Sequence, residues 1–278
     1  MTRRIIIAGM PNSGKSTFIA ALTHILVANE KDCALKLTGP SAEEAHLVKL
    51  EKDWLSGKKI QRTNSSTETW VEMHILEKAG DREMILSLPD KKGESFEQPA
   101  TIGHFDAELF GELVEADGLI VFVNADRADD KMMISDLGDL GSDEAASETA
   151  TPAKRFDPRE MPEEVKIVEL LQFANRRPLS GRLRKLVVII SAWDVVEAEL
   201  QDNPEAWLAK HTAMLSQFCE YNSDLWDTRV YGVSAQGGAL PADRDRLMAF
   251  DRPTDRVRIV GHGAAPHDLT LPLQWLLA

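Results

Sequence analysis

One short run near the N-terminus constrains the fold more than any other part of the chain. It follows the pattern G-x-x-x-x-G-K-[ST] and reads Gly9-Met10-Pro11-Asn12-Ser13-Gly14-Lys15-Ser16. The β-branched run over 4–8 predicts a strand before it, and apolar residues recurring over 17–26 predict an amphipathic helix after it. Backbone N–H groups in such a turn and the dipole of the following helix both favour negative charge. We therefore expect this turn to bind a nucleoside phosphate.

The residue types in the turn suggest individual roles. We expect Lys15 to reach the β- and γ-phosphates and the hydroxyl of Ser16 to bind Mg²⁺. Thr17 is placed to reach the α-phosphate with its hydroxyl. The other expected nucleotide-binding residues of the turn contribute through their backbone: Asn12, Ser13 and Gly14.

The order of apolar runs predicts an α/β chain. Its 278 residues, 43% of them hydrophobic, are enough for one large domain over 1–278. Strand patterns fall at 70–76, 84–88, 118–123, 186–190 and 229–233, and helix patterns at 41–57, 105–114, 162–173, 207–218 and 271–277. A hairpin turn at 79–81 separates the second and third strands. We therefore predict a mostly parallel sheet with one antiparallel strand and helices on both faces.

Several classes of protein are disfavoured by composition. No apolar run approaches the roughly eighteen residues that a membrane span needs. Because Met1-Thr2-Arg3-Arg4 leads straight into the first strand, we expect no signal peptide. The two cysteines, Cys33 and Cys219, have no paired spacing, which is typical of thiols in a reducing cytoplasm.

The net charge of −13 argues against a general nucleic-acid binder, which would present a basic face. The excess is concentrated in one segment. Between Asp126 and Glu164 there are 12 acidic and 5 basic residues, about half of the total imbalance. The segment is rich in Ala, Ser, Thr, Asp and Gly, so at 126–160 we expect a solvated, flexible insertion. An arm that docks a protein partner is the alternative, and both interpretations stay open.

A second nucleotide signature follows the strand at 84–88. The sequence Asp90-Lys91-Lys92-Gly93 has the form D-x-x-G. A carboxylate at this point can hold Mg²⁺ through its water shell, and the glycine lets its backbone N–H approach a γ-phosphate. The polar stretch 61–69 carries Thr63 and Thr67, either of which could complete the coordination of Mg²⁺ when a γ-phosphate is present. We favour Thr63, so the expected metal ligands are Ser16, Thr63 and Asp90.

Two further signatures also end predicted strands. The run Ser191-Ala192-Trp193-Asp194 has the form S-x-x-D, comparable with the N-K-x-D that reads guanine. A carboxylate at Asp194 would accept from both N1–H and the exocyclic amine, a donor pair that adenine lacks. Ser234-Ala235 ends the next strand, where a backbone N–H can meet the guanine O6. Trp193 is expected near the base, where it could stack.

In this order the motifs resemble the translation-factor-related class of P-loop GTPases. The sequence Gly9-x-Pro11-Asn12-Ser13-Gly14-Lys15-Ser16-Thr17 is similar to the corresponding motif of the Era-like and TrmE-like branch. The bacterial double-GTPase families are the most similar, on the following patterns: Trp54…Gly57…Arg62-Thr63, Leu88-Pro89-Asp90-x-x-Gly93-Glu94, Ser191-Ala192-Trp193-Asp194 and His267-Asp268-Leu269-Thr270…Pro272-Leu273…Trp275. The resemblance implies GTP and GDP as ligands, Mg²⁺ as cofactor, and association with conflict or multi-component signalling systems.

Departures from the class pattern modify this expectation. Ser191 and Ala192 replace the usual asparagine and lysine, so packing over the base is reduced. Glu94 stands where Ras-like enzymes have a glutamine that orients water; a carboxylate beside an anionic phosphate predicts slow hydrolysis and a partner that activates it. On this basis Lys15, Thr63 and Glu94 are the expected catalytic residues. Two alternatives remain: an ATP-using P-loop enzyme, or a nucleotide-binding structural module that does not hydrolyse.

Overall fold

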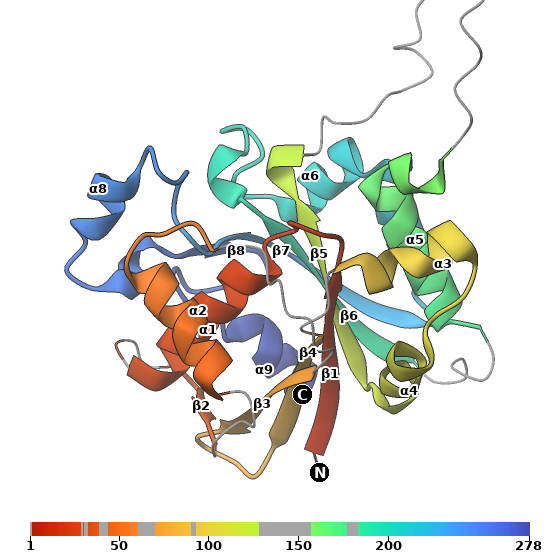
Figure 1. Ribbon diagram of the computed structural model, residues 1–278, viewed down its shortest axis with the longest axis horizontal. Coiled ribbons are helices and arrows are strands. Elements are labelled where there is room, and N and C mark those ends of the chain that lie inside the picture. The colour runs from red at the N-terminus through yellow and green to blue at the C-terminus, as the bar shows by residue number, and fades with distance from the viewer. Residues whose placement is uncertain are drawn as a thin grey trace, which may run out of the picture.

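The computed structural model describes residues 2–28, 30, 33–38, 44–60, 70–89, 93–127, 157–176 and 183–278. Within them, eight strands form one sheet in the order β2-β3-β4-β1-β5-β6-β7-β8 (Figure 1). Their bounds are β1 Thr2–Gly9, β2 Leu35–Leu37, β3 Trp70–Glu77, β4 Glu83–Pro89, β5 Gly118–Asn124, β6 Arg184–Ser191, β7 Trp226–Ser234 and β8 Arg258–Val260.

Five neighbouring strands run parallel. They are β4, β1, β5, β6 and β7. β3 pairs antiparallel with β4, which confirms the expected reversed strand. A second reversed strand, β8, pairs with β7 at the far edge, and the sequence analysis did not anticipate it. With only three residues, β8 is too short to show a hydrophobic alternation, and the same holds for β2.

Helices cover both faces of the sheet, as predicted (Figure 1). One face carries α1 Lys15–Ala28, α2 Glu44–Leu55 and α9 Leu271–Leu277. The other carries α3 Gln98–Ile102, α4 Ala107–Glu115, α5 Glu163–Ala174, α6 Pro204–His211 and α7 Ala213–Tyr221. The short helix α8 Arg244–Met248 lies on the same side of the view as α2 and farther from the centre of the sheet (Figure 1). None of the helices in the described part of the chain has the length and apolar character of a membrane span.

Short 3-10 turns connect several of these elements. They are η1 Gly93–Glu97, η2 Ala125–Arg127, η4 Pro158–Glu160, η5 Trp193–Val195 and η6 Pro253–Arg256. One expected helix is divided: the pattern over 207–218 predicted a single helix, but α6 and α7 meet at Thr212, whose φ of −137° is not helical. The backbone N–H and the hydroxyl of Thr212 both donate to the carbonyl of Leu208, at 2.8 and 2.9 Å, at the end of α6.

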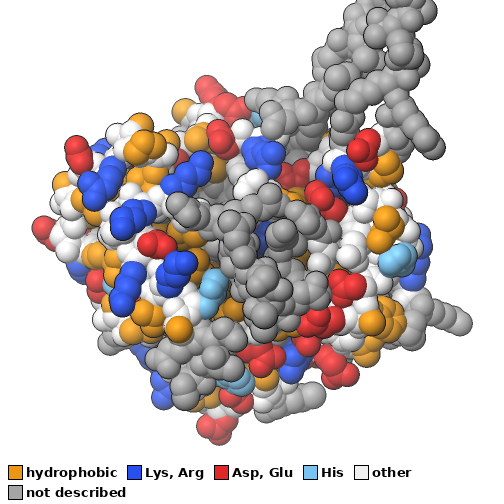
Figure 2. Space-filling view, in the orientation of Figure 1, with side chains coloured by type: hydrophobic (Ala, Val, Ile, Leu, Met, Phe, Trp, Pro, Cys, Tyr) orange, Lys and Arg blue, Asp and Glu red, His pale blue; other side chains and the backbone are white. Residues whose placement is uncertain are grey.

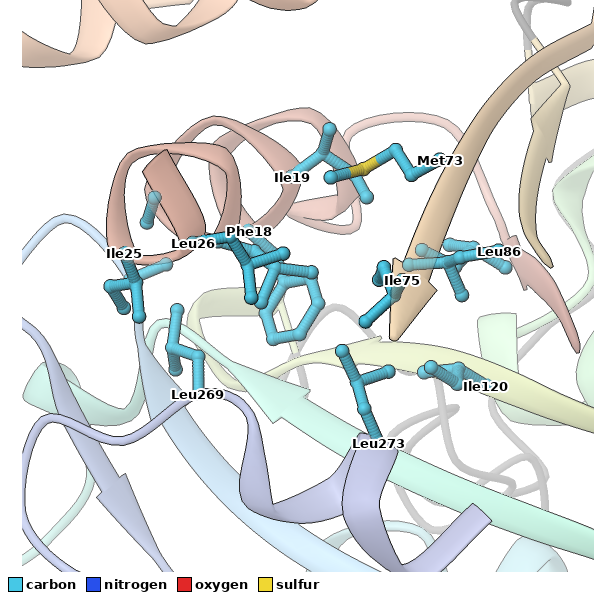
Figure 3. Close-up of a cluster of buried hydrophobic side chains, with 14 of the residues drawn as sticks. Phe18, Ile19, Ile25, Leu26, Met73, Ile75, Leu86, Ile120, Leu269 and Leu273 are labelled. Carbon is cyan, nitrogen blue, oxygen red and sulfur yellow. The ribbon is translucent and has the colours of Figure 1, made fainter. Parts of the chain in front are cut away.

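The buried side chains form two layers, one on each face of the sheet. β1 contributes side chains to both layers: Ile5 and Ile7 belong to the layer under α1, and Ile6 and Ala8 to the layer under α5. Successive side chains of a strand point to opposite faces, so a strand covered on both sides is apolar throughout. In the first layer, side chains of α1 face the sheet and meet the segment around α9 (Figure 3). The labelled members include Phe18, Ile25, Ile120, Leu269 and Leu273.

The parallel strands place their carboxyl ends along one edge of the sheet. The turn after β1, the η2 turn after β5, the η5 turn after β6 and the loop after β7 therefore lie together at that edge. Open α/β sheets bind ligands outside the carboxyl ends of their strands. A functional site is therefore expected at this edge.

Candidate functional site

The turn between β1 and α1 packs against the end of β6. A Cβ atom on Gly14, whose φ is +91°, would lie 2.8 Å from the Cβ of Ser191, so only glycine fits at this point. The hydroxyl of Ser191 donates to the carbonyl of Ser13 at 2.8 Å, with the carbonyl of Val123 3.2 Å away. Ser191 therefore fixes the glycine-rich turn to the strand that carries the S-x-x-D motif.

Lys15 lies at the first position of α1 and turns back over the loop. Its Nζ donates to the carbonyls of Gly9 at 2.8 Å and Met10 at 2.7 Å, and to the hydroxyl of Ser13 at 3.1 Å. Burial lowers the pKa of Lys15 to about 8, an effect that the negative charge of Glu163 partly offsets. Three acceptors thus hold an ammonium group at the turn, next to the N-terminus of a helix.

The ends of β6 and β7 meet through a pair of side chains. Asp194 Oδ1 accepts from the hydroxyl of Ser234 at 2.5 Å, and the same hydroxyl accepts from the backbone N–H of Gly237 at 3.0 Å. Asp194 is exposed, whereas Ser234 is buried. The serine therefore sets the orientation of a carboxylate that still faces solvent.

A cavity of about 280 Å³ joins the glycine-rich turn to this pair, close to the lower end of the roughly 300–1,000 Å³ range of small-molecule sites. Its walls include seven residues expected from the sequence: Asn12, Gly14, Thr17, Ser191, Asp194, Ser234 and Ala235. Ala192 lines it as well. The structure therefore brings together three motifs that lie far apart in the chain.

The sequence analysis missed part of this wall. Asn124 is the last residue of β5, Asp126 lies in η2, and Gln236 follows the Ser-Ala motif; all three line the cavity. The amide of Asn124 donates to the carbonyl of Asn12 at 3.0 Å, which ties the end of β5 to the glycine-rich turn. In the sequence, the signal that could have identified Asn124 as a site residue was its position at the carboxyl end of a clear predicted strand.

Trp193 was expected beside the base, and the structure corrects this. Its ring is fully buried, packs edge-on against Trp207, and donates through Nε1 to the carbonyl of Gln201 at 2.9 Å. A Cβ on Gly232 would lie 2.2 Å from the ring, so β7 needs glycine there to admit it. Trp193 is a core residue and does not line the cavity.

Ala192, at the position where the class pattern has lysine, adopts a left-handed backbone conformation with φ of 55°. Such a conformation is uncommon for a residue with a Cβ and costs on the order of 1–3 kcal/mol. Strain of this kind is often kept at binding sites. Ala192 therefore adds a strained backbone turn to the cavity wall.

The expected switch and metal residues are only partly described. Ser16 lies in the first turn of α1 and is partly exposed. Gly93 begins η1. Thr63, Asp90 and the side chain of Glu94 lie outside the described residues, as does most of the acidic segment expected at 126–160.

A charged residue that the sequence predicted only as part of a helix start lies close to the glycine-rich turn. Glu163 is the first residue of α5, and the charges acting on it include those of Arg127 and Lys15. Burial raises the pKa of Glu163 to about 7, against the opposing effect of these cations. Perturbed carboxyl groups of this kind gather at functional sites.

The model of one protein family, described as Double-GTPase 1, matches residues 6–276, which is nearly the whole chain. No curated protein matches the sequence.

Proposed function

The chain belongs to the Double-GTPase 1 family, and on that premise we propose that it is a P-loop GTPase that binds GTP and GDP with Mg²⁺ and hydrolyses GTP slowly. Membership of the family supports guanine-nucleotide binding, and the mostly parallel sheet with its ligand edge is consistent with the fold. One observation carries the proposal: a single cavity connects the glycine-rich turn to Asp194 and Ser234.

The phosphate end has suitable chemistry for a triphosphate. The Lys15 ammonium is held at the turn, and the N–H groups of the first turn of α1 have no acceptors within the helix. Both features favour an anion. Ser16 offers a hydroxyl for Mg²⁺ in the same turn, and Thr63 and Asp90 are the further ligands in this proposal. Bound Mg²⁺ would neutralise charge on the β- and γ-phosphates.

The base end has suitable chemistry for guanine. A carboxylate accepts about four hydrogen bonds, so the bond from Ser234 leaves Asp194 able to accept from N1–H and from the exocyclic amine. The backbone of Ser234 and Ala235 lies on the same cavity wall, where an N–H can meet O6. Adenine presents no such donor pair to the carboxylate.

The last part of the proposal concerns the rate of GTP hydrolysis and the response of the protein to the bound nucleotide. Glu94 in place of a water-orienting glutamine favours a slow intrinsic rate. Thr63 and Gly93 would respond to the γ-phosphate and thereby report the nucleotide state to a protein partner or activator. In this proposal residues 1–278 form one domain with an acidic insertion at 126–160, related to the Era-like and TrmE-like branch. The protein acts in the cytoplasm as a switch module of a multi-component bacterial system, such as a conflict system.

The proposal is tested by nucleotide competition followed by a substitution. We expect GTP and GDP to displace a fluorescent GDP analogue far better than ATP does. Asp194→Asn should lose GTP and gain xanthosine triphosphate, because the amide inverts part of the hydrogen-bonding pattern. Asp126→Asn, another carboxylate of the cavity wall, is the matched control and should keep the preference for GTP. A preference of the unmodified protein for ATP would favour an ATP-using enzyme. GTP binding with no release of phosphate would favour a structural module.

A further inference from the structure

Four charged side chains from three segments gather beside the phosphate turn, and none of them lines the cavity. Arg127, at the end of η2, donates through Nη1 to the carbonyl of Pro11 at 3.3 Å. Lys166 of α5 pairs with Glu97 of η1 at 2.9 Å and also donates to the carbonyl of Arg159 at 2.7 Å. Glu163 completes the group at the start of α5.

Glu163 differs from its neighbours because part of its carboxylate is unsatisfied. Its Oε1 is buried and accepts no hydrogen bond within the described part of the chain. A buried polar atom without a partner is costly, and native structures keep few of them. The adjacent Glu164 has a structural task, since its Oε2 accepts from the backbone N–H of Met214 at 3.2 Å. Glu163 has an open acceptor beside the phosphate-binding lysine instead.

The position of Glu163 relates it to the γ-phosphate end. α5 packs against η1, the segment that begins at Gly93, and Glu163 lies within the electrostatic reach of Lys15. A carboxylate near a triphosphate is normally unfavourable because both are anionic. Here the positive charges of Arg127, Lys15 and Lys166 act on Glu163 and offset that repulsion, while Glu97 opposes them.

We propose that Glu163 is a catalytic residue of GTP hydrolysis, whose carboxylate accepts a hydrogen bond from the attacking water and then takes its proton. The water oxygen forms the bond to the γ-phosphorus while the bond from that phosphorus to the β–γ bridging oxygen breaks. The electron pair of the broken bond leaves with GDP, and the proton passes from Glu163 to the inorganic phosphate. This inference depends on the GTP hydrolysis proposed above.

The test compares Glu163→Gln with Glu164→Gln, the same change one residue further along the helix. GTP is preloaded and phosphate release is followed in a single turnover, with affinities for GDP and a non-hydrolysable GTP analogue measured separately. We expect Glu163→Gln to slow release by roughly a hundredfold or more, the usual scale of general base catalysis, and to leave both affinities within about threefold. Glu164→Gln should hydrolyse at nearly the rate of the unmodified protein.

Glu163→Ala provides a second readout that a structural role would not affect. Added formate should restore part of its hydrolysis rate by supplying a carboxylate in the space left by the side chain, and should not accelerate the unmodified protein. Hydrolysis by Glu163→Gln within about threefold of the normal rate, or an alanine variant that formate does not rescue, would overturn the inference and leave the GTPase proposal intact. An unmodified protein that binds GTP and releases no phosphate would overturn both.

Discussion

Glu163 couples the stability of the protein to pH in a direction opposite to that of most carboxylates. Burial raises its pKa in the folded chain to about 7, above its ordinary value of 4.5. Between these values the folded chain binds more protons than the unfolded chain does. The stabilising contribution of Glu163 is therefore complete below pH 4.5 and is lost as the pH rises through about 7.

Glu163→Gln should reveal this coupling, because glutamine resembles the protonated carboxyl at every pH. At pH 8 we expect the variant to be more stable than the unmodified protein by on the order of 1–2 kcal/mol, allowing for partial exposure. This corresponds to a rise in Tm of roughly 2–6 °C. At pH 5 the difference should be much smaller. Calorimetry at the two pH values checks this, with Glu164→Gln as the control; a difference independent of pH would contradict it.

Lys15 is the second residue whose single substitution has a defined outcome. Lys15→Ala removes the ammonium that Gly9, Met10 and Ser13 hold at the turn. The lost charge-assisted contact is worth about 1.5–3 kcal/mol, so affinity for GDP should fall roughly tenfold or more. Titration calorimetry measures the change. Lys49→Ala, an exposed lysine of α2, should bind normally, and an unchanged affinity in Lys15→Ala would remove the turn from the site.

At the scale of elements, α2 supports the loop that follows β7. Trp54 is fully buried near the end of α2, and its Nε1 donates to the carbonyl of Ala235 at 2.9 Å. The guanidinium of Arg256 lies 3.8 Å from the centre of its ring and donates to its backbone carbonyl at 2.6 Å. One helix residue thus connects the Ser-Ala motif to η6, which gives a structural reason for Trp54 in the Trp54…Gly57 pattern.

Trp54→Phe should separate the effect of the hydrogen bond to Ala235 from the effect of packing in the core. The phenyl ring keeps most of the buried volume, but the hydrogen bond to Ala235 is lost, at a cost of about 1 kcal/mol. If that bond positions the loop for guanine, affinity for GDP should fall about fivefold, measured by displacement of a fluorescent analogue. Trp275→Phe, in α9, is the matched control and should leave affinity unchanged. Equal affinities for both variants would make Trp54 a core residue only.

The elements that the sequence predicted well are those with local signals. β1, the turn and α1 are specified by adjacent residues, and each parallel strand by its own apolar run. Errors arose where distant segments decide the outcome. Trp193 is buried because Gly232, on the neighbouring strand, leaves room for its ring, and no pattern around Trp193 encodes that. Glu163 acquires its significance only because α5 brings it to Lys15.

At the scale of the whole molecule, one sheet integrates both halves of the chain. β5 and β6 lie on either side of the acidic segment in sequence, yet they pair in parallel from Gly118–Lys185 to Asn124–Ser191. On the face in Figure 2, basic side chains gather on the left of the view and acidic side chains toward the lower right. The cavity at the carboxyl ends of the strands is therefore lined by residues from the turn after β1 to the loop after β7.

This integration predicts that the protein unfolds as one cooperative unit. Both hydrophobic layers contain residues from before and after the acidic segment, so neither half can open without exposing the core of the other. We expect a single calorimetric transition in which the van't Hoff and calorimetric enthalpies agree. GDP at about a hundred times its Kd should stabilise the whole transition by roughly 2.7 kcal/mol, whereas ATP at the same concentration should have little effect. Two transitions, only one of which shifts with GDP, would show that the chain contains two domains and that the site belongs to one of them.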